Sequence, residues 1–103
     1  MDSVEMVRLY LKGQNLEQVG REQEAIDNYE RAVSARFDST GPYDRLIALY
    51  SNRAQYADVI RVCDAALEHV HTYEEKRAWY GRMRAEADRA RVEVPRAAPK
   101  KNA

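Results

Sequence analysis

The chain matches itself when it is displaced by 34 residues, and this internal repeat limits the fold more than any other feature of the sequence. Small residues fall on small ones, and bulky apolar residues mostly fall on apolar ones. The aligned pairs are Leu9 with Tyr43, Leu16 with Tyr50, Gly20 with Ala54, Ala25 with Val59, Ile26 with Ile60, Tyr29 with Cys63, Ala32 with Ala66 and Val33 with Leu67. A fixed period of this length indicates one structural unit that occurs twice.

Apolar residues recur at helical spacing through both copies, whereas no stretch alternates as a strand would. The sequence therefore predicts an all-α fold of about five helices, at residues 3–19, 22–36, 42–53, 56–70 and 72–92. Ser3 is the expected cap of the first helix, Pro42 suits the first turn of the third, and Thr72 with Glu75 reads as a capping box for the fifth. Residues 93–103, which contain Pro95, are expected to form a disordered basic tail.

The repeated positions resemble the pattern of the tetratricopeptide-repeat family over about residues 6–73. The matching residues are Gly13, Leu16, Gly20, Ala25, Tyr29 and Ala32 in the first copy and Tyr43, Leu46, Tyr50, Ala54, Tyr56 and Ala66 in the second. The resemblance implies antiparallel helical hairpins stacked as a short right-handed α-solenoid. A single domain, 1–92, would then hold repeats at 6–39 and 40–73 and a capping helix at 73–92. It also implies a non-catalytic adaptor that binds a protein or peptide.

In that family, the first helix of each hairpin lines a concave groove in which peptides lie. Carried over by register, the resemblance implies a partner site made of Tyr10, Gln14, Gln18, Arg45, Asn52, Trp79 and Arg82. Arg45 and Arg82 have no near acidic neighbours in sequence on that face, so they are expected to grip a carboxylate or an acidic side chain of the partner. Tyr10 and Trp79 would supply apolar anchors. Trp79 could equally pack on the fourth helix as a core residue.

Residues that could carry chemistry are few, and no enzyme, metal site or cofactor is predicted. Cys63 falls in the apolar stripe of the fourth helix, which favours a buried thiol over a nucleophile. His69 and His71 point to different faces of a helix, and Glu68 with His71 would supply only two ligands. Phosphate-binding glycine loops and Ser/His/Asp groupings are missing from the sequence.

Charge divides the chain, although the net charge is zero. Residues 1–75 carry 8 Lys/Arg and 14 Asp/Glu, whereas residues 76–103 carry 9 and 3. Such asymmetry favours self-association into a scaffold or contact with an anionic partner. A nucleic-acid-associated module that uses the basic fifth helix and tail is a further alternative. Glu86, Asp88 and Glu93 interrupt that basic run and argue against a nucleic-acid partner. The sequence has no long apolar run and no signal-peptide pattern at its start, so we expect a cytoplasmic protein without membrane contact.

Overall fold

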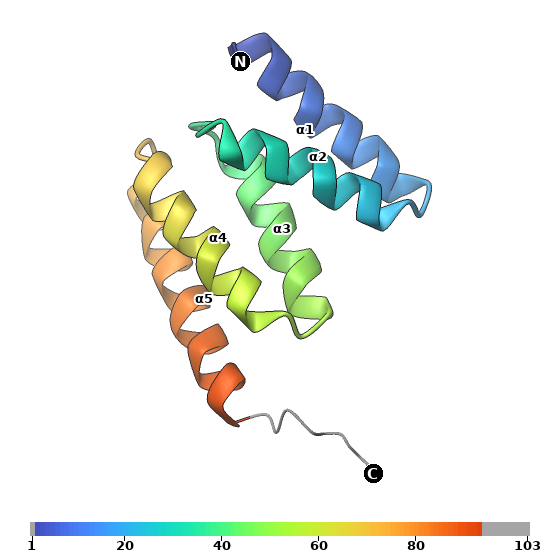
Figure 1. The fold of residues 1–103 in the computed structure, drawn as a ribbon. Coiled ribbons are helices and arrows are strands. Elements are labelled where there is room, and N and C mark those ends of the chain that lie inside the picture. The colour runs from blue at the N-terminus through green and yellow to red at the C-terminus, as the bar shows by residue number, and fades with distance from the viewer. Residues whose placement is uncertain (1, 94–103) are drawn as a thin grey trace.

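The computed structural model describes residues 2–93, which form five helices and no strand (Figure 1). The helices are α1 (Ser3–Gln18), α2 (Glu22–Ser34), α3 (Thr40–Asn52), α4 (Tyr56–His69) and α5 (Glu74–Glu93). Helices account for 83% of the described residues. The expected all-α class with five helices is therefore confirmed. Beyond Glu93, the expected basic tail lies outside the described residues.

Local signals at the helix ends explain where α1 and α3 begin. The Asp2 side chain accepts a hydrogen bond from the Glu5 N–H at 2.9 Å, and the Glu5 carboxylate accepts one from the Asp2 N–H at 3.1 Å. This capping box makes Asp2 the cap of α1, so the expected cap, Ser3, was wrong by one residue. Pro42 lies in the first turn of α3, as expected, where a missing N–H costs no helical bond. The fifth helix begins two residues after Thr72.

The 34-residue period reappears in the turn between the two helices of each hairpin. α1 and α3 end at residues 18 and 52, and α2 and α4 begin at residues 22 and 56. Gly20 and Ala54 both adopt the left-handed conformation, with φ of 81° and 57°. In each turn the following N–H donates to the carbonyl five residues back, at 2.8 Å in the first turn and 2.9 Å in the second. These bonds close both helices in the same way, so the sequence repeat is also a repeat of backbone structure.

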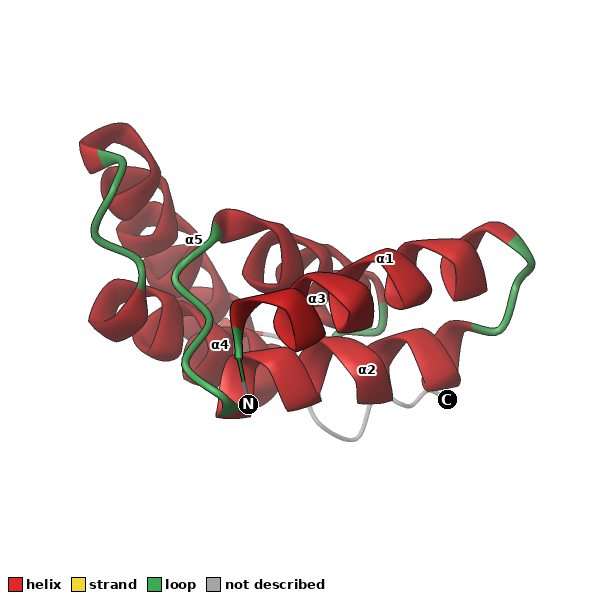
Figure 2. Cartoon of the chain, turned by 90° about the horizontal axis from the view of Figure 1, so that it is seen from above, coloured by secondary structure: helices red, strands yellow, loops and turns green. Residues whose placement is uncertain are grey.

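The helices pack in chain order, each against the next (Figure 1). α1 with α2 and α3 with α4 form two antiparallel hairpins, and α5 packs on α4. From above, α1 and α3 lie in one layer and α2 and α4 in the other (Figure 2). One buried cluster runs through all these contacts, from Leu16 in α1 to Ala87 in α5. The first helix of each hairpin therefore shares one face of the molecule.

Equivalent positions of the two copies have the same burial. Ala25 and Val59, the fourth residues of α2 and α4, are both completely buried, as are Ala32 and Ala66, seven residues later. Small side chains at these positions allow the two helices of a hairpin to approach closely. The expectation that Ala25 and Val59 occupy equivalent places is confirmed.

One pair of positions exchanges a large residue for a small one between the copies. In the first hairpin, an added Cβ on Gly13 would overlap the ring of the buried Tyr29. In the second hairpin the same positions hold Ile47 and Cys63, which are also buried. The bulk has moved from α2 in the first copy to α3 in the second. Because the combined volume changes little, both copies can keep a filled core.

Candidate binding groove between α3 and α5

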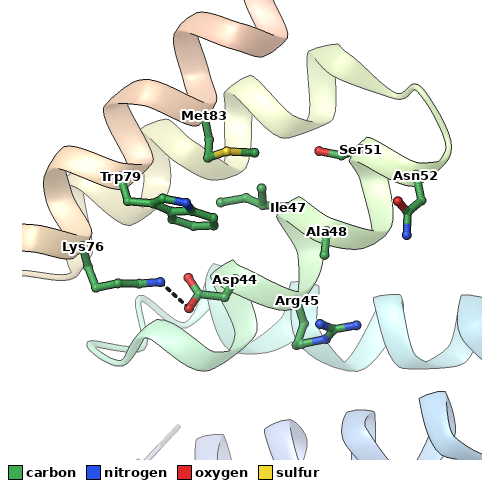
Figure 3. Close-up of a pocket in the computed structure, with 9 residues that line it drawn as sticks. All are labelled: Asp44, Arg45, Ile47, Ala48, Ser51, Asn52, Lys76, Trp79 and Met83. Atoms are coloured by element: carbon green, nitrogen blue, oxygen red, sulfur yellow. Dashed lines mark ion pairs between the residues drawn. The ribbon is translucent and has the colours of Figure 1, made fainter.

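A groove of about 360 Å³ lies between α3 and α5 (Figure 3). Its lining residues come from one face of each helix. They are Asp44, Arg45, Ile47, Ala48, Ser51 and Asn52 from α3, and Lys76, Trp79 and Met83 from α5. On α5 the spacing is i, i+3 and i+7, the spacing at which side chains share a face of a helix. Since α3 contributes most of the lining, the groove opens on the helix layer that contains α1 and α3.

The base of the groove is apolar. Ile47 is buried, and Trp79 and Met83 are half-buried against the core. The Trp79 ring packs edge-on to Tyr80, with centroids 5.4 Å apart. The Lys76 ammonium lies 4.1 Å from the Trp79 ring centroid, a cation–π contact. Trp79 therefore packs on the core with part of its surface and lines the groove with the rest.

One ion pair bridges α3 and α5 at the edge of the groove. The Lys76 ammonium lies 2.8 Å from an Asp44 carboxylate oxygen, as the dashed line in Figure 3 marks. The other Asp44 oxygen accepts a hydrogen bond from the Tyr80 hydroxyl at 2.9 Å. Burial of Tyr80, and then the nearby Asp44 carboxylate, raise the pKa of the Tyr80 hydroxyl far above its usual range. Tyr80 therefore remains a neutral donor that holds Asp44 in place.

Arg45 already has an anionic partner within the chain. Its Nε and Nη2 donate to the two Glu17 carboxylate oxygens at 3.0 and 2.7 Å, which joins α3 to α1. The buried Tyr29 hydroxyl donates to the same carboxylate. The hydrogen bond from Arg45 lowers the pKa of Glu17, the bond from Tyr29 adds to this, and partial burial opposes both. Arg45 has no near acidic neighbour in sequence on its helix face, but Glu17, 28 residues earlier, is close to it in space.

The remaining predicted site residues lie outside the groove. The Tyr10 ring covers Gly41 at the start of α3 and lies 6.0 Å from the Tyr29 ring, and its hydroxyl accepts a bond from Gln14 at 3.0 Å. Gln18 is exposed at the end of α1, and Arg82 is exposed on α5. Of the seven predicted residues, the structure brings Arg45, Asn52 and Trp79 together.

Six lining residues were missing from the predicted site, namely Asp44, Ile47, Ala48, Ser51, Lys76 and Met83. A signal for two of them was present in the sequence. Lys76 and Met83 stand three residues before and four residues after Trp79, so they share its helical face. Asp44 and Ser51 carry no such signal, because their placement depends on the angle between α3 and α5.

Most basic residues of α5 are occupied within the chain. Lys76 pairs with Asp44, Arg84 with Asp64 at 2.7 Å, and Arg91 with Asp88. Arg77 donates instead to the backbone carbonyls of residues 67 and 70 at the end of α4. These contacts reduce the positive charge that α5 could offer to phosphate groups.

The sequence candidates for chemistry are part of the packing. Cys63 is completely buried, as expected, and burial raises the pKa of its thiol to about 12. His69 packs against Tyr43, with Nδ1 3.0 Å from the hydroxyl oxygen. Within residues 2–93, no group of three or more His, Cys, Asp or Glu side chains could hold a metal ion.

None of the described helices is long and apolar enough to cross a membrane. Comparison with protein-family models, curated proteins and solved structures gives no match for this chain.

Proposed function

We propose that this chain is a tetratricopeptide-type adaptor without catalytic activity, which binds a peptide segment of another protein in the α3–α5 groove. The observation that carries the proposal is the half-buried Trp79 at an apolar groove edged by polar side chains. Aromatic residues in such partly desolvated positions are the usual anchors of protein interfaces. The 34-residue repeat of turns and helix ends supports the family.

The polar edge of the groove supports a peptide with an acidic group near an apolar side chain. Lys76 has three N–H donors and directs one towards Asp44, which leaves others for a carboxylate of the partner. Ser51 and Asn52 can donate to and accept from a peptide backbone. Arg45 and Arg82 were expected to bind the acidic group of the partner. We assign that role to Lys76 instead, because Glu17 already neutralises Arg45.

Peptides selected from a displayed random library against the full chain are the probe for this proposal. Replacing Trp79 with alanine should weaken their binding by at least about tenfold, since 1.4 kcal/mol corresponds to a factor of ten and aromatic anchors often exceed it. Ala48→Gln should also weaken binding, because the longer side chain would fill the groove without adding charge. The dissociation constants can be measured by fluorescence anisotropy of the labelled peptides.

Arg82→Ala is the matched control, because Arg82 lies on α5 but outside the lining of the groove. The groove proposal expects unchanged peptide affinity for this variant, whereas the wider site implied by the family resemblance expects a loss. Thermal unfolding of every variant separates lost binding from lost structure. Unchanged affinity in both Trp79→Ala and Ala48→Gln would show that the peptides bind elsewhere.

A further inference from the structure

The two junctions between successive first helices use the same positions of the repeat. Where α1 meets α3, Tyr10 covers Gly41 and Glu17 bonds to Arg45. Where α3 meets α5, α3 contributes residues 44, 47, 48 and 51 to the groove. Residues 44, 48 and 51 are the second-copy equivalents of residues 10, 14 and 17 on α1. In the first junction, α3 contacts α1 through residues 41 and 45. In the second, α5 faces α3 through residues 76 and 79. Each first helix therefore has one face for the helix before it and another for the helix after it.

When the contact positions of α3 are moved 34 residues forward onto α5 and 34 residues back onto α1, they identify two faces that no described residue covers. On α5, the face towards a following unit consists of Ala78, Gly81, Arg82 and Ala85. All four are exposed, and a Cβ added to Gly81 would meet nothing within 4 Å. On α1, the face towards a preceding unit contains Val7, Arg8 and Leu11.

The exposed α1 face is apolar. The equivalent face of α3 contacts α1, and that of α5 lies against α3. Val7 is 42% exposed and Leu11 is 51% exposed, and Val4, one turn earlier, is 59% exposed. Leu11 takes the position of Arg45, which bonds to α1, and of Trp79, which packs beside α3. We call Val4, Val7 and Leu11 the α1 ridge. Three large apolar side chains at i, i+3 and i+7 on one exposed face indicate a surface that another molecule covers.

We infer that the α1 ridge of one copy of this chain packs on the α5 face (Ala78, Gly81 and Ala85) of a second copy. In this head-to-tail contact, large side chains would meet small ones, as Tyr10 meets Gly41 within the chain. The contact continues the junctions already present between α1, α3 and α5. It uses the side of α5 away from the groove and does not depend on the proposed peptide binding.

Charge follows one order in the junctions within the chain. In ion pairs that join the first hairpin to the second, or the second hairpin to α5, the acidic side chain usually comes earlier in the chain and the basic side chain later. The pairs are Glu17 with Arg45, Glu22 with Arg53, Glu30 with Arg61, Asp44 with Lys76 and Asp64 with Arg84. The pair with the opposite order, Arg36 with Glu68, is long at 3.8 Å.

Between two copies, the register of the repeat does not reproduce the ion pair of the first junction. Displacing the Glu17–Arg45 pair to the new junction gives Ala85 and Leu11, which are both exposed and would make an apolar contact in its place. Arg8 and Arg82 lie on the two faces with like charge, which weakens the contact. The self-association should therefore depend on concentration and should strengthen in Arg82→Glu, which replaces repulsion with attraction.

Sedimentation velocity of the full chain over a wide concentration range tests the contact. A head-to-tail contact leaves one free face at each end of a dimer, so the parent chain should form dimers and then larger open or ring-shaped species as concentration rises. Leu11→Glu removes one face and Gly81→Gln obstructs the other, and each should lower the association constant by at least about tenfold. Both positions are exposed, so circular dichroism should show an unchanged fold.

Mixing the two variants distinguishes this contact from other modes of association. Leu11→Glu keeps an intact α5 face and Gly81→Gln keeps an intact α1 ridge, so the mixture should form a dimer that does not grow. Val19→Glu, at a position 68% exposed and outside the ridge, should associate like the parent chain. A monomer at all concentrations, or a mixture that stays monomeric, would overturn the inference. Self-association retained in Gly81→Gln and lost in Leu11→Glu would also overturn it, by indicating contact between two α1 helices.

Discussion

Cys63 should react with a thiol reagent at least about a thousandfold more slowly in the folded chain than in the unfolded chain. Burial raises the pKa of this thiol to about 12. The usual value is about 8.5, and the difference alone reduces the reactive thiolate near neutral pH by a factor of roughly a thousand or more. The side chain is also completely buried, so the reagent has no direct access to the sulfur. Reaction should then require opening of the α3–α4 hairpin.

The measurement is the time course of labelling with a chromogenic disulfide reagent, in buffer and in denaturant. Cys63 is the single cysteine of the chain, so the signal belongs to one site. The labelling rate in buffer should rise with added denaturant in parallel with the fraction unfolded. Rapid stoichiometric labelling of the folded chain would contradict the described burial. It would also restore Cys63 as a candidate nucleophile and weaken the proposal of a non-catalytic adaptor.

Tyr29→Ala should destabilise the chain by about 3–5 kcal/mol, the usual loss on truncating a large buried aromatic residue. Tyr29 is completely buried, its ring fills the space left by Gly13, and its hydroxyl donates to Glu17. The Tyr10 ring packs on it and reaches α3 over Gly41. Its removal should therefore loosen both the first hairpin and the junction between hairpins. Domains of this size have a total stability of about 5–15 kcal/mol, so the variant would be close to unfolding.

Urea unfolding of Tyr29→Ala and Tyr29→Phe measures the two contributions of this residue. Tyr29→Phe keeps the ring and removes one hydrogen bond to Glu17, which retains Arg45 as a partner. Its loss should be about 1–2 kcal/mol, below the full value for a bond to a charged group. If the alanine variant lost no more stability than the phenylalanine variant, the ring would not be part of the core.

The turns within the two hairpins could be predicted closely because the repeat supplied the same turn twice. The turn at Gly20 was evident from glycine, and the turn at Ala54 followed from its place in the second copy. The ends of single helices were less certain, because several residues near them can act as caps. Asp2 and Ser3 are both suited to capping, and Glu5 three residues after Asp2 favours Asp2. The same kind of pattern indicated a capping box at Thr72, yet α5 begins at Glu74, two residues later rather than directly after Thr72.

The groove could be predicted only in part, because its shape depends on contacts between helices. Register placed Asn52 and Trp79 on the faces of α3 and α5 that line the groove. The same reasoning left Arg45 without its partner, since Glu17 lies 28 residues earlier and on another helix. Tyr10 was expected to be an anchor for a partner, but its ring covers Gly41. Periodicity identifies the face of a helix, whereas the side chain that meets that face follows from packing.

The most direct test of the proposed function is nuclear magnetic resonance of the labelled chain with a selected peptide. Trp79 is the single tryptophan of the sequence, so one indole N–H signal reports on the groove without ambiguity. Peptide binding in the groove should shift this signal and the backbone amides of residues 44–52 and 76–83. Shifts confined to the amides of α2 and α4, with an unchanged indole signal, would place the peptide on the opposite layer and contradict the proposal.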